Sequence, residues 1–291
     1  MEDANLIACL YPHEDDKEFR YARGAIGSPE NSSRYVSAMR QKPHPLLGRQ
    51  SRESTAPLEE QKDETPAYLY EPGLQLTFSH RPKGDKGFAL EKGRNKCDIV
   101  LPNVEDSISG CHCYLTFDDQ NRLILQDNSF NGTIVTYDGK GGERRRKFTW
   151  ILGGHKVPDE KTKKIVIEFH KHLKFRIVVS KHETHPDQYI DNVKRFRADT
   201  ASQDELPFGR LGMDSSGPTA AHSEAHTPSQ GRILLKQGTL GKGGFAIVTH
   251  FWDVSTGIEY ACKKPRDKKR FDRKSWEKEI HIMSKIEHVS R

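Results

Sequence analysis

Short apolar runs separated by turn-forming residues fill the stretch from about residue 68 to 180. They are rich in β-branched and aromatic residues, and Gly, Asn, Asp or Pro stands between them. The runs are AYLYEPGLQLTF, CDIVL, CYLTF, RLILQD, GTIVTY, KFTWIL, KIVIEF and KFRIVV. Regular short strands without a helical period are typical of an all-β sandwich or barrel. We therefore expect a mainly β domain over residues 68–180.

The segments on either side of this domain differ from it in composition and periodicity. Residues 1–67 mix charge with Ser, Pro and Gly and show no sustained period, which predicts a disordered N-terminal region. Residues 181–230 are poor in apolar residues and end in DSSGPTAAHSEAHTPSQG, which is typical of a flexible linker. Residues 231–291 return to strand-like runs and end in a helical pattern. The apolar positions of that pattern are Trp276, Ile280, Met283 and Ile286.

Composition sets limits on this organisation. The 291 residues are 30% charged and 34% hydrophobic, with a formal net charge of +6. The length allows two domains, and the polarity predicts that part of the chain is unfolded. A modest positive charge suits a protein that meets phosphates or acidic peptides, and we expect no direct nucleic-acid binding. No window reaches the apolar length of a membrane span, so we expect no membrane partner.

The cysteines indicate reduced thiols in the cytosol or nucleus. There are five, an odd number, and none forms a C-x-x-C pair. The tripeptide Cys111-His112-Cys113 raises the question of a metal. In a strand the histidine would point away from its neighbours, so three consecutive residues cannot close a tetrahedral site. We expect buried thiols and no metal.

Three polar motifs stand at the ends of strand runs in the β domain. They are Gly93-Arg94, Ser109-x-x-His112 and Asn131-Gly132-Thr133. In this order and spacing they resemble the forkhead-associated (FHA) family, whose members are β-sandwiches that bind phosphothreonine peptides through their end loops. Each motif alone has a plainer interpretation, as a solvated arginine, a turn hydroxyl or a hairpin turn. Together they predict a phosphopeptide site.

The chemistry of a phosphothreonine explains these residue types. It brings nearly two negative charges and three acceptor oxygens, so its receptor needs a fixed cation and short donors. Arg94 can supply a planar, charged fork, Ser109 a hydroxyl, and Asn131 an amide that clamps the peptide backbone. The resemblance implies that His112 braces the binding loop. Proteins that contain phosphothreonine are the expected partners.

Glycines and departures from the family pattern also enter the prediction. We expect Gly93 and Gly132 to permit backbone geometry that a Cβ would forbid. The family often carries Asn, Arg or Lys after the motif serine, where this chain has Gly110. It often has a small polar residue before the motif asparagine, where this chain has Phe130. The charged run from Glu143 to Lys147 is expected to be a solvated loop, with extra phosphate contacts as the alternative.

The last segment, residues 231–291, resembles the start of a eukaryotic protein kinase domain. The glycine-rich stretch GTLGKGGFAIV leads into YACKK and then EKEIHIM. The resemblance implies an incomplete α+β N-lobe of three strands and one helix, ATP with magnesium as cofactor, and an ion pair between Lys263 and Glu279. The residues that it assigns to ATP are Gly241, Gly243, Gly244, Phe245, Ala246, Val248, Ala261 and Lys263.

The kinase motifs H-R-D and D-F-G, which supply the catalytic base and the magnesium ligands, are missing from the 291 residues. We therefore predict that the chain as given transfers no phosphate, and that three strands with an open edge are marginally stable alone. The ending His288-Val289-Ser290-Arg291 suggests the hypothesis of a retained intron or a truncated gene model of a longer kinase. A natural truncation is the alternative.

An FHA module ahead of a kinase lobe resembles the checkpoint effector kinases of the DNA-damage response. This resemblance implies Ser/Thr kinase ancestry and a location in the nucleus or cytoplasm, with the nucleus favoured. It also makes Ser202-Gln203 and Ser229-Gln230 candidate phosphorylation sites. Two functions remain open: a phosphothreonine-binding module, and the N-terminal part of an ATP-dependent Ser/Thr kinase. Sequence carrying the two missing motifs would distinguish them.

Overall fold

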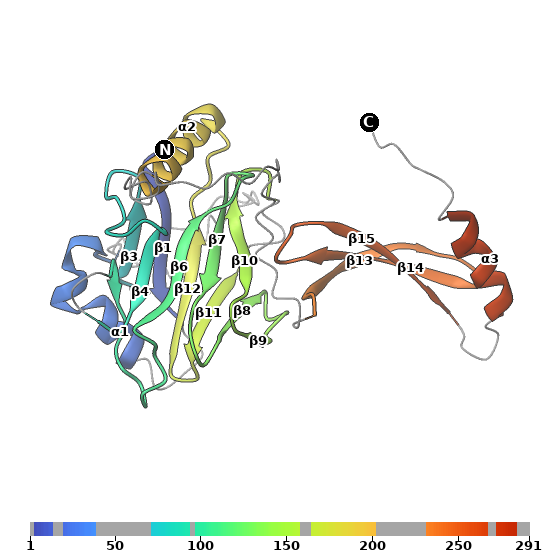
Figure 1. Cartoon of the computed structure of the whole chain (residues 1–291), viewed down its shortest axis with the longest axis horizontal. Helices are drawn as coiled ribbons and strands as arrows, with labels where there is room; N and C mark the ends of the chain where they lie inside the picture. The colour runs from blue at the N-terminus through green and yellow to red at the C-terminus, as the bar shows by residue number, and fades with distance from the viewer. Residues whose placement is uncertain are drawn as a thin grey trace, which may run out of the picture. The chain divides into compact units, whose positions relative to one another are not determined.

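The computed structural model describes residues 3–13, 20–38, 71–93, 97–157, 164–201, 231–266 and 272–283. The contacts divide the chain into two units, Met1–Gly231 and Arg232–Arg291, whose elements are drawn in Figure 1. The first unit is a β-sandwich, and the second is a three-stranded sheet with a helix. The expected mainly β class is confirmed. No helix in the described ranges is long and apolar enough to cross a membrane.

The sandwich consists of a seven-stranded sheet, in the order β2-β3-β1-β12-β11-β8-β9, and a five-stranded sheet, in the order β10-β7-β6-β4-β5. The strands of the first sheet are β1 (Leu6–Pro12), β2 (Tyr35–Val36), β3 (Gly73–Thr77), β8 (Thr133–Tyr137), β9 (Arg144–Arg145), β11 (Ile165–His170) and β12 (Leu173–Val179). Those of the second are β4 (Phe88–Glu91), β5 (Ile99–Val100), β6 (Cys111–Phe117), β7 (Arg122–Asp127) and β10 (Thr149–Gly154). The helices are α1 (Arg20–Ile26), the 3-10 helix η1 (Pro29–Arg34) and α2 (Pro186–Ala201). Only the pairing of β4 with β5 is parallel among the described strands.

The core of the sandwich follows from the two-residue period of its strands. In β8 every second residue is buried, and these residues are Thr133, Val135 and Tyr137. The largest fully buried side chains include Trp150 and Phe88. Burying an aromatic side chain of this size contributes roughly 1.5–3 kcal/mol to folding. The apolar face of each strand therefore holds the two sheets together, and leaves the end loops free for other roles.

The prediction of disorder for residues 1–67 is wrong for part of that segment. β1 lies in the seven-stranded sheet between β3 and β12, with Leu10 opposite both Leu74 and Ile177 (Figure 1). Its residue Ile7 is also buried. The run LIACLYP is too short to show a period of its own, and its partner strands are far away in the chain. Long-range pairing therefore decides its structure.

The prediction of a flexible linker over residues 181–230 is wrong for α2. This helix buries Tyr189, Val193 and Phe196, which are spaced as one helical face. The Tyr189 hydroxyl donates a hydrogen bond to the carbonyl of Asn121, at 2.9 Å. The other residues of the helix are mostly polar, so the segment has a low mean apolar content. Its single apolar stripe is therefore not recognised from the sequence as a helix that packs on the sandwich. Residues 202–230 of the predicted linker lie outside the described residues.

The second unit has the expected strand and helix order. It consists of β13 (Leu234–Lys242), β14 (Ala246–Asp253), β15 (Glu259–Pro265) and α3 (Arg273–Met283). β14 pairs with both other strands, all antiparallel. Large apolar side chains are exposed on this unit, namely Leu234, Leu240, Phe245, Ile258, Ile280 and Ile282. Such a sheet buries little of its apolar surface, so it is expected to be marginal by itself.

Candidate functional site

The loops that carry the FHA-like motifs meet at one end of the sandwich. Glu91 at the end of β4 lies opposite Cys111 at the start of β6. Cys113 lies opposite Asp127 at the end of β7. β6 is antiparallel to β4 and β7, and the short strand β5 runs parallel to β4 beside its last two residues. The β4–β5, β5–β6 and β7–β8 loops therefore lie at the same end of the sheet. The β6–β7 turn lies at the other end, beside α2.

Ser109 connects the neighbouring loops. Its Oγ accepts a hydrogen bond from the backbone N–H of Phe130, at 3.1 Å, and its carbonyl accepts one from the N–H of Lys92, at 3.3 Å. A hydroxyl has one proton and two acceptor lone pairs. Since Oγ acts as an acceptor toward Phe130, its proton remains available to donate. A positioned hydroxyl donor suits an anionic group.

Asn131 projects from the β7–β8 loop. Its side-chain Nδ2 donates to the carbonyl of Ser107, at 2.9 Å, and the side chain is otherwise exposed. One amide N–H is thereby used to fix the side chain, and Oδ1 and the second N–H face solvent. Ser109 and Asn131 therefore come from two loops that are tied together by two hydrogen bonds.

Gly132 and Gly93 differ in what their backbones require. Gly132 has a φ of 79°, and a Cβ there would lie 2.7 Å from the carbonyl oxygen of Arg145. A side chain at this position is therefore excluded by both conformation and space. At Gly93 the φ is outside the left-handed region, and a Cβ would meet no described atom within 4 Å. The expectation that Gly93 avoids a forbidden backbone geometry is therefore wrong.

Asp127, which lies outside the three predicted motifs, fixes the β7–β8 loop. Its buried carboxylate accepts hydrogen bonds from the hydroxyls of Ser129 and Thr133, both at 2.7 Å, and from the backbone N–H of Lys147, at 2.9 Å. A buried carboxylate needs such donors to offset the loss of hydration. The stretch QDNSFNGT, with Asp and Asn ahead of Ser and Gly, carried the turn signal that could have identified it.

His112 lies under the β5–β6 loop. Its Nδ1 accepts a hydrogen bond from the backbone N–H of Ser109, at 3.3 Å, and its ring packs edge-on against Phe169. Burial lowers the pKa of His112 from 6.5 to about 4, so the ring is neutral at pH 7. With Nδ1 as acceptor, the ring proton is on Nε2. The geometry thus links the imidazole to the residue that carries the candidate hydroxyl.

Arg94, with Asn95 and Lys96, lies outside the described residues. The chain on either side of them is described, and the Sγ of Cys97 donates to the carbonyl of Gly93, at 2.6 Å. The hydrogen bond from Lys92 to Ser109 brings the start of this loop beside the β5–β6 loop. The contact of Arg94 with a phosphate therefore stays a prediction. The described residues on either side of Arg94 lie at the expected end of the sandwich.

The N-terminal segment anchors the strand that follows the Arg94 loop. Asn31 in η1 donates to the carbonyl of Val100, at 3.0 Å, and accepts from the N–H of Val100, at 2.8 Å. Arg34 forms an ion pair with Asp98, at 2.8 Å, with the two side chains 6% and 0% exposed. The guanidinium of Arg34 also lies 4.8 Å from the ring centre of Phe88. Residues from the segment predicted to be disordered therefore help to position the loop.

The charged run from Glu143 to Lys147 is more than a solvated loop. Arg144 donates to the carbonyl of Gly132, at 2.7 Å, and Arg146 donates to the carbonyl of Phe130, at 3.3 Å. Lys147 contacts the carbonyl of Asn128, at 3.4 Å. Basic side chains therefore run along the β7–β8 loop and hold its backbone. Four of its five residues are exposed, as a solvated loop requires, and the alternative of extra phosphate contacts stays a prediction.

In the second unit, three of the residues assigned to ATP share one face of the sheet. Val248 lies directly opposite Lys263, and His250 lies opposite Ala261. Directly opposite residues of an antiparallel pair project from the same face, as do residues two apart in one strand. Val248, Ala261 and Lys263 are therefore on one face. Lys263 also forms an ion pair with Glu279 of α3.

The glycine-rich turn between β13 and β14 has space around it. A Cβ at Gly241 or Gly244 would meet no described atom within 4 Å, and one at Gly243 would have only the carbonyl of Ala246 at 3.6 Å. None of these glycines has a φ in the left-handed region. The ring of Phe245 is 85% exposed. The turn itself therefore does not require glycine, and a group from outside could approach its backbone closely.

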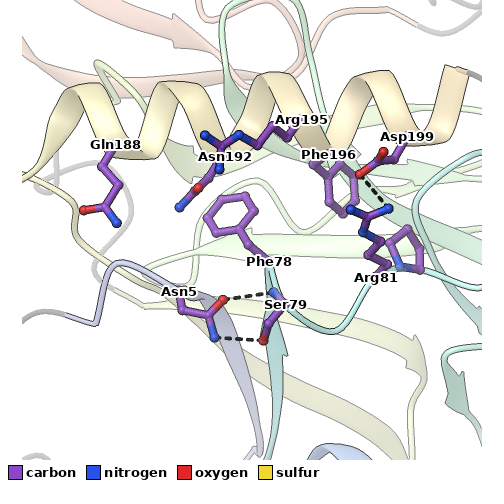
Figure 2. A pocket seen from close by; sticks show the side chains of 10 residues that line it. Asn5, Phe78, Ser79, Arg81, Gln188, Asn192, Arg195, Phe196 and Asp199 are labelled. Carbon is purple, nitrogen blue, oxygen red and sulfur yellow. Dashed lines mark hydrogen bonds and ion pairs between the residues drawn. The ribbon is translucent and has the colours of Figure 1, made fainter.

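A cavity of about 400 Å³ lies between α2, the segment before β1 and the end of β3 (Figure 2). Arg81 and Asp199 pair across it at 3.2 Å. Asn5 exchanges two hydrogen bonds with Ser79, both at 2.9 Å. α2 packs at the β6–β7 end of the sandwich, so this cavity is separate from the FHA-like loops. These four polar residues therefore form two pairs with each other. Their arrangement indicates no class of ligand for the cavity.

Comparison with known proteins supports the resemblance of the first unit to the FHA family. Residues 91–149 match the family model described as FHA domain. A search of solved structures found the crystal structure of Rad53 1-466 in complex with AMP-PNP, at 15% sequence identity and a TM-score of 0.36. That match covers 75% of this chain and 47% of the Rad53 chain, so this chain spans about half of that length. A search of curated proteins gave no match. The family model alone therefore identifies an FHA domain within the sandwich, over residues 91–149.

Proposed function

We propose that the loop end of the sandwich binds phosphothreonine peptides. The observation that carries the proposal is the Ser109–Phe130 hydrogen bond together with the Asn131–Ser107 hydrogen bond. These bonds hold the two loops against each other. The loops then present the hydroxyl proton of Ser109 and the free amide groups of Asn131. A phosphorylated side chain needs such pre-positioned donors, because ordering them only on binding costs conformational entropy. The FHA match supports the same ligand class.

Each residue has a distinct proposed role. Arg94 supplies the fixed positive charge and binds the phosphate, and Ser109 donates its hydroxyl to a phosphate oxygen. Asn131 uses its free Oδ1 and N–H on the backbone of the peptide. His112 holds Ser109 through the backbone N–H, and so acts by positioning. The partner class is proteins that contain phosphothreonine.

The test is a titration of the full chain with a phosphothreonine peptide and its unphosphorylated twin. We expect binding of the phosphorylated peptide only. Hydrogen bonds to charged groups contribute roughly 1.5–3 kcal/mol, so Arg94→Ala should weaken binding by at least about tenfold. Arg20→Ala removes the same charge from a surface of α1 and serves as the control. Equal binding of both peptides would remove this function.

A second proposed function is nucleotide binding by the second unit. The observation that favours it is the ion pair of Lys263 with Glu279 beside a turn whose glycines the fold does not require. Lys263 fits the phosphates of ATP, and Val248 and Ala261 offer a small apolar face to the adenine. When bound, ATP would supply the phosphoryl group for transfer. No cluster of three or more His, Cys, Asp or Glu that could hold a metal occurs in the described ranges, so we assign no magnesium ligands.

This second function is tested by titrating the full chain with a fluorescent ATP analogue. We expect saturable binding that Lys263→Ala abolishes. Lys264→Ala is the matched control, because Lys264 is adjacent in β15 and projects from the other face. An absence of saturable binding at millimolar nucleotide, or equal loss in both variants, would reject nucleotide binding.

A checkpoint role is proposed from the order of the two units. A phosphopeptide-binding module ahead of a kinase-like lobe would place the chain in a nuclear phosphorylation pathway. Ser202 and Ser229 lie outside the described residues. Mass spectrometry of the protein from cells with and without DNA damage should detect phosphate on these serines only after damage. Unmodified serines under both conditions would contradict this role.

A further inference from the structure

Phe130 occupies the exposed tip of the β7–β8 loop and contacts residues on both sides through its backbone. Its N–H donates to the Oγ of Ser109 at 3.1 Å, and its carbonyl accepts from the guanidinium of Arg146 at 3.3 Å. Its ring is 84% exposed. Arg146 is therefore joined to the candidate phosphate-binding hydroxyl through a single residue. Phe130 is adjacent to Asn131, so a peptide that contacted Ser109 and Asn131 would pass beside this edge of the loop.

The three arginines at this edge differ in whether a carboxylate forms an ion pair with them. Arg144 pairs with Glu168 at 3.2 Å, and Arg145 pairs with Glu143 at 2.5 Å. Arg146 is exposed and has no carboxylate partner among the described residues, although its neighbours in sequence have one each.

The carboxylates of the neighbouring β5–β6 loop are also engaged. Asp106 pairs with Lys92 at 3.1 Å, and Glu105 lies 3.4 Å from the Nε2 of His170. These acidic groups therefore have partners of their own. The guanidinium of Arg146 has five N–H donors, and one hydrogen bond to a carbonyl leaves most of them free.

We infer that Arg146 forms a second anion subsite, which binds an acidic side chain of the same phosphothreonine peptide. This inference rests on the proposed phosphopeptide function. The ligand is an anionic group, either the carboxylate of Asp or Glu or a second phosphate. Arg146 is held at the loop edge by the Phe130 carbonyl, so its remaining donors are directed without ordering a free side chain. The subsite makes the module selective for phosphothreonine within an acidic sequence.

The experiment scans a phosphothreonine peptide with otherwise neutral flanks. A Glu, or in a second series a phosphoserine, is placed at each position in turn, and affinity for the full chain is measured by fluorescence anisotropy. An exposed ion pair predicts a gain of about two- to fivefold for Glu at one favoured position. Phosphoserine there should give a larger gain because it carries up to two charges. The gain should shrink at high salt.

Variants assign the gain to Arg146. Arg146→Gln should bring the ratio of the affinities for acidic and neutral peptides close to one, and Arg146→Glu should favour Lys at the same position. Arg195→Gln is the matched control, since Arg195 lies on α2 at the β6–β7 end of the sandwich, and it should keep the wild-type ratio.

The outcomes separate the two proposals. A wild-type chain that shows no gain at any position, or a gain that Arg146→Gln retains, overturns the subsite. Equal binding of phosphorylated and unphosphorylated neutral peptides overturns the phosphopeptide function itself.

Discussion

Arg34 and Asp98, which are 64 residues apart in the chain, form a buried ion pair at 2.8 Å. Asp98 follows the loop that carries Arg94 and also accepts hydrogen bonds from the backbone N–H groups of Lys83 and Ala89, at 3.2 and 3.0 Å. A segment that looks polar and aperiodic in sequence therefore fixes the end of the loop that carries Arg94. Burial lowers the pKa of Arg34, and the carboxylate of Asp98 opposes this shift.

Removing one partner of this pair should destabilise the sandwich strongly. Arg34→Ala leaves the Asp98 carboxylate buried and without its counter-ion, and such losses typically cost about 3–5 kcal/mol. Urea unfolding followed by fluorescence measures the effect. Arg23→Ala is the control, because its ion pair with Glu71 is exposed and should contribute about 1 kcal/mol at most. Similar losses in both variants would contradict the importance of burial.

Deleting residues 1–67 should prevent the sandwich from folding. β1 is an interior strand of the seven-stranded sheet, so its removal leaves β3 and β12 with unpaired edges and exposes their apolar side chains. We expect a chain that begins at residue 68 to be insoluble or to lack a cooperative thermal transition. Deleting residues 202–230 instead should keep that transition. A soluble, cooperatively folding chain beginning at residue 68 would refute this expectation.

His112 should make stability depend on pH below neutrality. Its pKa is about 4 in the folded protein and 6.5 in the unfolded chain. The unfolded state binds the proton first, so stability is full above pH 6.5 and falls as the pH drops toward 4. The loss approaches about 3 kcal/mol at 1.36 kcal/mol per pKa unit. Urea unfolding of the wild type and His112→Gln at pH 7 and 4.5 should show a shallower loss in the variant; parallel losses would exclude His112 as the cause.

Gly132 and Gly110 should respond differently to alanine. At Gly132 the positive φ and the 2.7 Å approach to the carbonyl of Arg145 predict a loss of roughly 1–3 kcal/mol. At Gly110 a Cβ would meet no described atom, so the change should stay within about 0.5 kcal/mol. Thermal unfolding of the two variants makes the comparison. A stable Gly132→Ala protein would show that the loop can adopt another backbone.

Phe130→Ala should separate binding from stability. The ring is 84% exposed, so its removal should change the free energy of unfolding by no more than about 0.5 kcal/mol. We expect the ring to contact the peptide and its truncation to weaken binding by about 1 kcal/mol, the value above which an interface residue counts among the minority that carry most of the binding energy. Peptide titration and thermal unfolding of the same variant test both parts. An unchanged affinity would show that the peptide does not contact this ring.

Several features could be predicted from local sequence. The strand runs of residues 68–180 alternate or cluster apolar residues with the period of a strand, so the mainly β class follows from short-range pattern. The motifs around Ser109 and Asn131 stand at strand ends, and antiparallel pairing brings such ends together. The order of strands and helix after residue 231 could also be predicted, because each element has its own period.

Only the tertiary structure decided the roles of residues whose partners are distant in the chain. β1 is a short run that becomes a strand by pairing with β3 and β12, and α2 forms a helix whose single apolar stripe packs on the sandwich. Arg34 and Arg146 make contacts that no local period encodes. Local pattern determines which backbone conformation a segment favours. Burial and long-range hydrogen bonding determine which polar side chain lies beside which loop.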